Sequence, residues 1–294
     1  HRDPRQGAGA GTGGPPVSDE QTPEPTVTPE TDGRVIEPVA EQYNARLVRR
    51  VDQGDDLAYF WVKLDDAPVP FEPGQYLTIG VFADGKLWQR PYSVASAPVQ
   101  AGRDGYEFYV RLVPIQRFTT LLWRLELGHQ LRMTGPKGKF MLEPADDRTH
   151  LYVSTGTGIA PFVSMIRETK ALRKPRRTVI VNGVSYADEL GYRELLEGLE
   201  RDGSYPLTYV PTVSRPNDPR NAGWTGRTGR VESVIAAVCR DLGLQPERTV
   251  VYICGNPEMI LNVESVLMDR GFPEFHVKKE LYWPKGKAPA PAAG

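Results

Sequence analysis

The chain has 294 residues, enough for two domains, and a formal net charge of −1, which argues against a protein that binds nucleic acid along its surface. Two cysteines are too few for a four-cysteine iron–sulfur cluster on this chain or for a disulfide framework, so a reducing, cytoplasmic location is predicted. The sequence contains no run of about 18 apolar residues and no histidines at metal-ligand spacing, so neither a membrane span nor a bound metal is predicted.

Both ends of the chain have the composition of unfolded segments. Residues 1–33 are rich in Gly, Pro, Thr and acidic side chains and contain almost no large apolar ones, so burial cannot offset the entropy of ordering them. They also lack the apolar stretch of an export signal. We therefore predict a disordered tail over residues 1–33 and a second, flexible tail over residues 285–294.

The first ordered region, residues 34–147, has a pattern of short β-strands. Runs rich in Val, Tyr, Phe and Leu are separated by turn dipeptides such as Pro73-Gly74 and Asp84-Gly85. The runs cover residues 46–51, 57–64, 75–82, 86–94, 106–113 and 130–134. Short strands at this spacing favour an antiparallel barrel, interrupted by one helix over residues 119–127.

The second region, residues 148–284, alternates strands with helices. Strands are predicted over residues 149–153, 178–184, 207–213 and 249–254, and helices over residues 159–173, 188–201, 230–240 and 257–270. Asn256 is the expected N-cap of the last helix, Pro257 its first residue, and Gly271 the residue just beyond it. The alternation predicts a parallel, doubly wound sheet whose ligands bind outside the carboxyl ends of the strands.

The turn Gly156-Thr157-Gly158 joins the first of these strands to its helix. Such a turn points backbone N–H groups and the positive end of a helix dipole at a phosphate, and glycine lets the backbone approach it closely. Pro161 suits the first helical turn, where no N–H is needed. A turn that binds nothing is an equally good interpretation of these residues alone.

Arg90-Pro91-Tyr92-Ser93 ends a barrel strand and combines a cationic fork, a flat aromatic face and a small hydroxyl. Alone it is better interpreted as an ordinary strand. Together, however, Arg90–Ser96, Thr155–Pro161, Cys254–Pro257 and Glu280–Trp283 resemble, in order and spacing, the motifs of the ferredoxin–NADP(H) reductase family, above all its bacterial branch. The resemblance covers about residues 40–284. It implies an antiparallel Greek-key β-barrel that binds FAD, followed by a Rossmann-like α/β domain with a parallel sheet that binds NADP(H).

The resemblance implies an FAD site built mainly from the barrel. Tyr92 would cover one face of the isoalloxazine with Ser93 near its reactive N5, and Tyr282 and Trp283 would cover the other face and the adenine side. Further contacts are implied for Arg90, Pro91, Tyr109, Arg117, Phe118, Thr119 and Thr155. Gln116 stands where the family usually has Gly, although Thr119 and Thr120 remain suitable partners for the FAD phosphates.

An NADP(H) site at the strand ends is also implied. Its residues would be Gly156, Thr157, Gly158, Pro161, Ser185, Ser214, Arg215, Arg230, Cys254, Gly255 and Asn256. An Arg fork with a hydroxyl favours the 2′-phosphate of NADPH, whereas an acidic group would meet NADH, and no Asp or Glu occurs at Ser214-Arg215. The alternative is that both arginines are solvated loop charges. Many bacterial relatives carry Arg where this chain has Ser185, which implies weaker discrimination.

Four residues are implied to act in catalysis: Ser93, Cys254, Glu280 and Tyr282. Cys254 would align the nicotinamide C4 for hydride transfer, although a cysteine that ends an apolar strand is usually a small buried hydrophobe. Glu280 would relay protons near the flavin, or else be a solvated charge. Cys239 is predicted to pack in the core. No role is predicted for His129, His150 and His276.

The predicted activity is that of a ferredoxin–NADP(+) reductase, which moves a hydride between NADPH and FAD and single electrons to or from ferredoxin or flavodoxin. One alternative is an NAD(P)H-dependent reductase component that serves an oxygenase, a cytochrome or free flavin. Another is a flavin- or nucleotide-binding sensor without turnover. A monomer is expected, with an acidic electron carrier as partner. A basic rim for that carrier is hypothesised from Arg46, Arg49, Arg50, Lys137, Lys139, Lys278 and Lys279.

Overall fold

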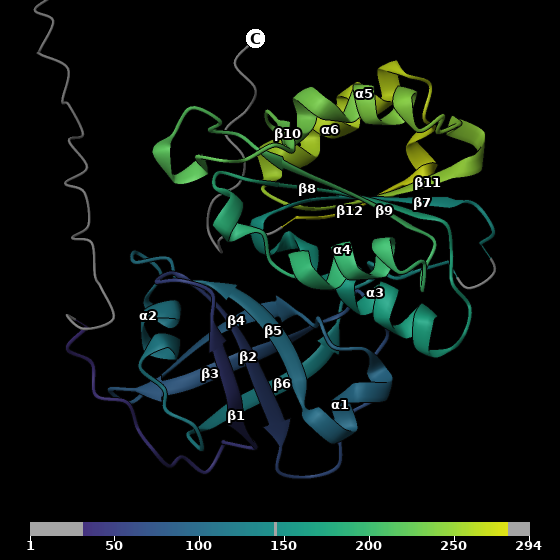
Figure 1. Cartoon of the computed structure of the whole chain (residues 1–294). Helices are drawn as coiled ribbons and strands as arrows, with labels where there is room; N and C mark the ends of the chain where they lie inside the picture. Colours follow the sequence, from purple (N-terminus) through teal and green to yellow (C-terminus); the bar gives the residue numbers. More distant parts are fainter. Residues whose placement is uncertain (1–31, 144–145, 282–294) are drawn as a thin grey trace, which may run out of the picture.

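The computed structural model describes residues 32–143 and 146–281, which contain two six-stranded sheets (Figure 1). In the first sheet all neighbouring strands are antiparallel, in the order β4-β3-β6-β1-β2-β5. Its strands are β1 (Ala45–Asp52), β2 (Leu57–Leu64), β3 (Tyr76–Ala83), β4 (Lys86–Ser93), β5 (Tyr106–Arg111) and β6 (Gln130–Lys137). The pairing of β3 with β6, and of β6 with β1, requires the crossover connections of a Greek key.

Alternate side chains of these strands point into one core, where Leu47, Phe60, Ile79 and Phe108 are fully buried. The predicted antiparallel barrel is confirmed. Its helices are less well predicted. The helix expected over residues 119–127 is α2 (Arg117–Trp123). A second helix, α1 (Pro98–Asp104), was not predicted, because Ala97 offers no capping side chain and the first turn has no acidic residue.

The second sheet is parallel throughout, in the order β10-β9-β8-β7-β11-β12. Its strands are β7 (Thr149–Thr155), β8 (Thr178–Val184), β9 (Leu207–Val213), β10 (Arg227–Thr228), β11 (Thr249–Gly255) and β12 (Val277–Leu281). The strand order reverses between β7 and β11, so the loops that follow these two strands diverge and leave a crevice. The predicted doubly wound sheet is confirmed, and β10 and β12 are additions to it.

Four helices cover the parallel sheet, two on each face (Figure 1). They are α3 (Ala160–Ala171) and α4 (Arg193–Arg201), on the side of the barrel, and α5 (Val231–Asp241) and α6 (Pro257–Asp269), on the far side. The Asn256 side chain accepts the N–H groups of Glu258 and Met259, as predicted for an N-cap. The predicted start of α4 at residue 188 is wrong, because Tyr192 has a left-handed backbone (φ 59°) that interrupts the helix.

The segment that precedes β1 is fastened to the barrel rather than free. Asp32, which the predicted tail included, is buried and forms an ion pair with Arg34. Thr120 donates a hydrogen bond to the same carboxylate (2.6 Å), and Arg124 binds the Asp32 backbone oxygen (2.8 Å). Burial opposes ionisation of Asp32, but the bond from Thr120 and the nearby cations hold its pKa below the ordinary value.

Two contacts join the barrel to helix α3. Arg167 of α3 forms an ion pair with Glu107 of β5 (2.7 Å), and Ser164 donates a hydrogen bond to the backbone oxygen of Ser96 (2.8 Å). These contacts fix the barrel against α3, the helix that follows the glycine turn. Of the helices in the described part of the chain, none is both long and apolar enough to cross a membrane.

Candidate active site

Two cavities lie where the barrel meets the carboxyl ends of the parallel strands. The first, of about 430 Å³, is lined mainly by β4, β5 and the start of α2, and is called here the barrel cavity. The second, of about 600 Å³, is lined by the loops that follow β7, β8, β9 and β11, and is called the strand-end cavity. Arg111 and Thr157 line both, so the two cavities adjoin.

The barrel cavity brings together most of the predicted flavin residues. Its lining includes Arg90, Pro91, Tyr92, Ser93, Tyr109 and Thr119. Tyr92 is held from behind by Phe118, with ring centres 6.0 Å apart, and by Phe108 at 6.4 Å. Burial raises the pKa of the Tyr92 phenol, which therefore stays neutral. A half-buried ring fixed by aromatic packing provides a rigid platform for a planar ligand.

The other predicted flavin residues that the structure describes do not line the barrel cavity. Phe118 is buried against Tyr92, and the Arg117 guanidinium lies over the Trp88 ring, 5.8 Å from its centre. Thr155 lines the strand-end cavity instead. Tyr282 and Trp283 lie outside the described residues.

The two threonines of α2 face different parts of the molecule. Thr120 is fully buried and its hydroxyl binds Asp32, so it faces the N-terminal segment and not the cavity. Thr119 lines the cavity, but its hydroxyl accepts the Val113 N–H (3.1 Å) and can donate its one proton to the backbone oxygen of Gln116 (2.9 Å) or of Val113 (3.0 Å). Thr119 therefore shapes the loop before α2.

Glu280 reaches the barrel cavity from the other sheet. It lies on β12, which pairs with β11 so that Glu280 is opposite Cys254. Its Oε2 is 3.4 Å from the Ser93 hydroxyl oxygen. Burial raises the pKa of this carboxyl to about 7, and the contact with Ser93 partly offsets that effect. Near neutral pH this carboxyl can both hold and release a proton.

Cys254 is fully buried and belongs to a core cluster with Ile159 and Tyr252. It lines neither cavity. Its predicted role beside a nicotinamide therefore stays a prediction. Cys239, as expected, is buried among the apolar side chains of α5.

The loops after β7 and β11 form one wall of the strand-end cavity. Gly156, Thr157, Gly255 and Asn256 line it, and the Asn256 N–H donates to the Thr155 hydroxyl (3.1 Å), which joins the loops after β7 and β11. Gly156 has a left-handed backbone (φ 50°), and open space surrounds the position of its absent side chain. Such a cradle suits a pyrophosphate.

Two residues that were predicted to contact the nucleotide, Gly158 and Pro161, instead pack beneath the loops that line the cavity. A Cβ on Gly158 would lie 2.8 Å from the Cys254 carbonyl carbon and closer still to its oxygen, so glycine here permits the close packing of two loops. Pro161 is buried within the first turn of α3. Neither lines the cavity.

The predicted 2′-phosphate residues are brought together only in part. Ser185, Ser214 and Arg230 line the strand-end cavity. Arg215 does not: its guanidinium donates to the Tyr186 hydroxyl (2.7 Å) and lies over that ring.

A buried carboxylate in the same wall was not foreseen. Glu189 lines the strand-end cavity and is 7% exposed. It forms an ion pair with Arg111 of the barrel (3.1 Å). Nothing in the sequence around Glu189 distinguishes it from a solvated helix-start residue, because its partner lies on a distant strand.

The hypothesised basic rim is largely neutralised. Arg46, Arg50, Lys278 and Lys279 form ion pairs with Asp65, Asp52, Glu143 and Glu264. Arg49 stacks on Trp61. In the described part of the chain only Lys137 and Lys139 of this set have neither an ion pair nor a ring contact, and Gly138 between them borders Glu280.

Comparisons with known proteins agree with this arrangement. Residues 44–142 match the oxidoreductase FAD-binding domain family and residues 152–265 the oxidoreductase NAD-binding domain family. The chain is 33% identical to ferredoxin–NADP reductase B of Sorangium cellulosum over 72% of this chain and 85% of the relative. It is 29% identical to the phenol hydroxylase P5 protein of Acinetobacter pittii, over 83% of this chain and 66% of the relative.

Among solved structures, a ferredoxin NADP+ reductase of Neisseria gonorrhoeae with bound FAD and NADP has the same fold. It superposes with a TM-score of 0.70 at 22% identity, over 82% of this chain and 99% of that one.

Proposed function

Because the chain belongs to the ferredoxin–NADP(H) reductase family of FAD- and NAD(P)-binding oxidoreductases, we propose that it takes a hydride from NADPH and passes single electrons to ferredoxin or flavodoxin. The observation that supports this most is the pair of adjoining cavities with Arg111 and Thr157 as shared walls. A nicotinamide bound from one side and a flavin bound from the other would meet there.

The lining of the barrel cavity fits the flavin part of FAD. Tyr92 supplies a flat, neutral face, Arg90 a cationic fork and Ser93 a hydroxyl at the edge. We assign Tyr109 to the same site as a wall residue. When bound, FAD accepts a hydride and releases its electrons one at a time.

In this proposal Ser93 and Glu280 manage the proton that accompanies the electrons. Glu280 holds a proton below about pH 7 and loses it above, and the Ser93 hydroxyl, 3.4 Å away, bridges the carboxyl to the bound ring. Cys254 and Tyr282 are proposed to position the nicotinamide, and Trp283 to close the adenine side.

The strand-end cavity fits an NADP(H) molecule. Backbone N–H groups after β7 and β11 would hold the pyrophosphate, and Ser214 and Arg230 the 2′-phosphate. We propose that Gly158 and Pro161 contribute by fixing the turn and the start of α3, not by direct contact.

An acidic one-electron carrier is the proposed partner. Lys137 and Lys139 flank Gly138, which borders Glu280 at the edge of the barrel cavity. These two lysines form no ion pair among the described residues. Their positive charge, at the edge of the proposed flavin site, would attract and orient an acidic carrier. We propose that the enzyme works as a monomer.

A second candidate is a reductase component that serves an oxygenase. Relatives of this chain include the phenol hydroxylase P5 protein and the reductase component of a propane 2-monooxygenase from Rhodococcus jostii, which is 27% identical. Steady-state turnover with NADPH separates the candidates. The proposal expects much faster reduction of ferredoxin or flavodoxin than of free flavin or an oxygenase component, and the reverse order would favour the second.

A further inference from the structure

Glu189 places a negative charge where a phosphate-bearing ligand is proposed to bind. Its side chain lines the strand-end cavity together with Ser185 and Ser214. Its Oε2 accepts the backbone N–H groups of Ser185 (3.2 Å) and Tyr186 (3.4 Å), so the carboxylate is bound to the loop that forms this wall. An unneutralised carboxylate at this point would repel the 2′-phosphate of NADPH and would act less on NADH, which lacks that group.

The cation closest to Glu189 comes from the barrel. Arg111 is the last residue of β5, and its guanidinium is 3.1 Å from Glu189 Oε1. It also binds Asp56, at 2.5 Å. Arg220 is 4.0 Å from the same Glu189 oxygen, but its Nε donates to Asp188 at 2.8 Å. Arg111 is therefore the nearer of the two cations to Glu189, and it shares its charge with Asp56.

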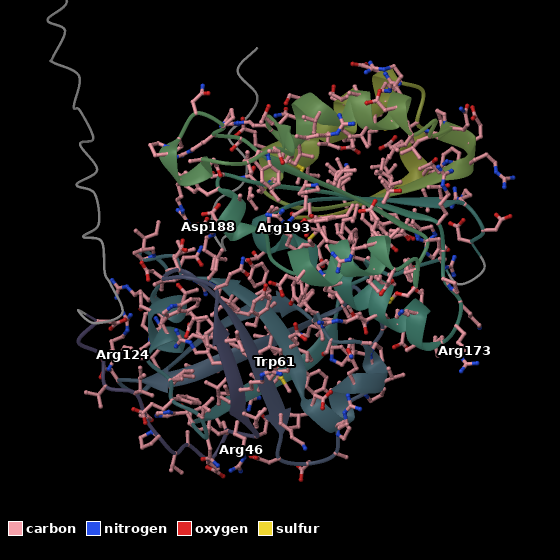
Figure 2. The ribbon with its side chains drawn as sticks, viewed as in Figure 1. Arg46, Trp61, Arg124, Arg173, Asp188 and Arg193 are labelled. Atoms are coloured by element: carbon pink, nitrogen blue, oxygen red, sulfur yellow. The ribbon has the colours of Figure 1, made fainter. Side chains whose placement is uncertain are left out.

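The loop that carries Glu189 is fixed to the barrel on both sides. The Tyr109 hydroxyl donates to the Glu189 backbone oxygen (3.2 Å), and Gln53 donates to that of Asp188 (2.9 Å). The Tyr192 N–H donates to the Tyr59 hydroxyl (3.1 Å). Figure 2 shows Asp188 at the junction of the barrel and the parallel-sheet layers. Anchored in this way, Glu189 cannot simply turn away from the cavity when its counter-ion is lost.

We propose that Arg111, a residue of the flavin-binding sheet, sets the nucleotide preference of the neighbouring sheet by neutralising Glu189. The inference rests on the proposed NADPH site. Arg111 is a positioning residue here: it acts on the nucleotide through Glu189. The preference for NADPH over NADH then depends on how the two sheets are docked and not only on Ser214 and Arg230.

Equilibrium binding of NADP+ and NAD+ to the oxidised, FAD-loaded protein tests this, with the dissociation constants measured by calorimetry and the FAD content by absorbance. Arg111→Met should weaken NADP+ binding about tenfold more than NAD+ binding, because one uncompensated charge faces an extra dianion in a partly solvated cleft. Arg111→Met with Glu189→Gln should regain most of that loss. Arg111→Lys keeps the charge, but one ammonium replaces the two nitrogens that bind Asp56 and Glu189, so it should lose clearly less of the preference than Arg111→Met.

Arg193→Met is the matched control. Arg193 forms an exposed ion pair with Glu197 one helical turn away and lines neither cavity, so both dissociation constants should stay unchanged. Equal weakening of NADP+ and NAD+ in Arg111→Met, or no recovery on adding Glu189→Gln, would overturn the inference. If Arg111→Met no longer binds FAD, the test uses Arg111→Lys instead. Loss of the preference for NADP+ over NAD+ in that variant, which retains the positive charge, would contradict the inference. An unmodified protein that binds neither nucleotide would instead contradict the proposed function.

Discussion

The two cavities adjoin but are built by opposite means. The barrel cavity depends on side chains that project from antiparallel strands, with Tyr92 fixed by Phe118 and Ser93 opposite Glu280. In one wall of the strand-end cavity side chains are absent, since Gly156 and Gly255 expose backbone at the ends of parallel strands. Removing atoms should therefore damage the first cavity, and adding atoms should damage the second.

The sharpest test adds one methyl group behind the strand-end cavity, where the turn after β7 packs on the loop after β11. Gly158→Ala should reduce nucleotide-dependent flavin reduction by about 100-fold or more, because the new Cβ meets backbone atoms of Cys254 and Gly255 that cannot move separately. Gly156→Ala is the matched variant, with a smaller expected loss: its Cβ meets no protein atom, so it bears the left-handed backbone cost of about 1–2 kcal/mol and the methyl group that it places in the cavity. Equal losses in the two variants would contradict the account of the cradle.

The reciprocal test removes a ring from the barrel cavity. Tyr92→Ala should weaken FAD binding by about 30- to 100-fold, since an aromatic face fixed by Phe118 and Phe108 is lost, as measured by flavin titration of the stripped protein. Tyr92→Phe keeps the ring and should stay within about threefold. An alanine variant that retains FAD would show that other walls hold the flavin.

What the sequence could predict follows from the same contrast. The glycine turn, the N-cap Asn256 and the strand–helix alternation are local patterns, so the parallel sheet and its cradle were predicted. The antiparallel barrel was predicted as well, from short strands between turn dipeptides. Side-chain direction is not local. Thr120 binds Asp32 and Arg215 binds Tyr186, and neither contact was predicted, because those partners lie far away in the chain.

The same reason explains what was missed altogether. Arg111 ends β5 and Glu189 follows β8, so the two are far apart in the chain and neither carries a signal of the other. The strand β12, which brings Glu280 to Ser93, is only five residues long and was not predicted, although Glu280 itself was identified from the family motif.

The carboxyl of Glu280 makes the barrel cavity sensitive to pH. Burial raises its pKa from the ordinary value of 4.5 to about 7. Between these two pH values the folded protein keeps a proton on Glu280 that the unfolded chain has released. This carboxyl therefore stabilises the fold fully below its ordinary pKa, and the contribution is lost as the pH rises through about 7. Compared with Glu280→Gln, the unmodified protein should lose at most about 3 kcal/mol of unfolding free energy between pH 5 and 8.

Denaturant titrations at several pH values measure this difference. The turnover rate should also depend on this carboxyl. A plot of rate against pH should show a change with an apparent pKa near 7, and this change should be absent from Glu280→Gln. A change that persists in the glutamine variant would assign the proton transfer to another group.

The smallest expected effect concerns the two arginines near the proposed 2′-phosphate. Arg230→Leu should weaken NADP+ binding about tenfold, because Arg230 lines the cavity, whereas Arg215→Leu should weaken it only about threefold, because Arg215 is held by Tyr186. Calorimetry with NADP+ and NAD+ distinguishes them. A larger effect of Arg215 would mean that it leaves Tyr186 when nucleotide binds.

The central claim is that the adjoining cavities bring a nicotinamide and a flavin together, and an anaerobic stopped-flow trace tests it most directly. Flavin absorbance is followed after the FAD-loaded protein is mixed with NADPH and, separately, with NADH. Rapid bleaching by NADPH and much slower bleaching by NADH is the predicted result. A yellow protein that neither nucleotide bleaches would contradict the account and favour a sensor without turnover.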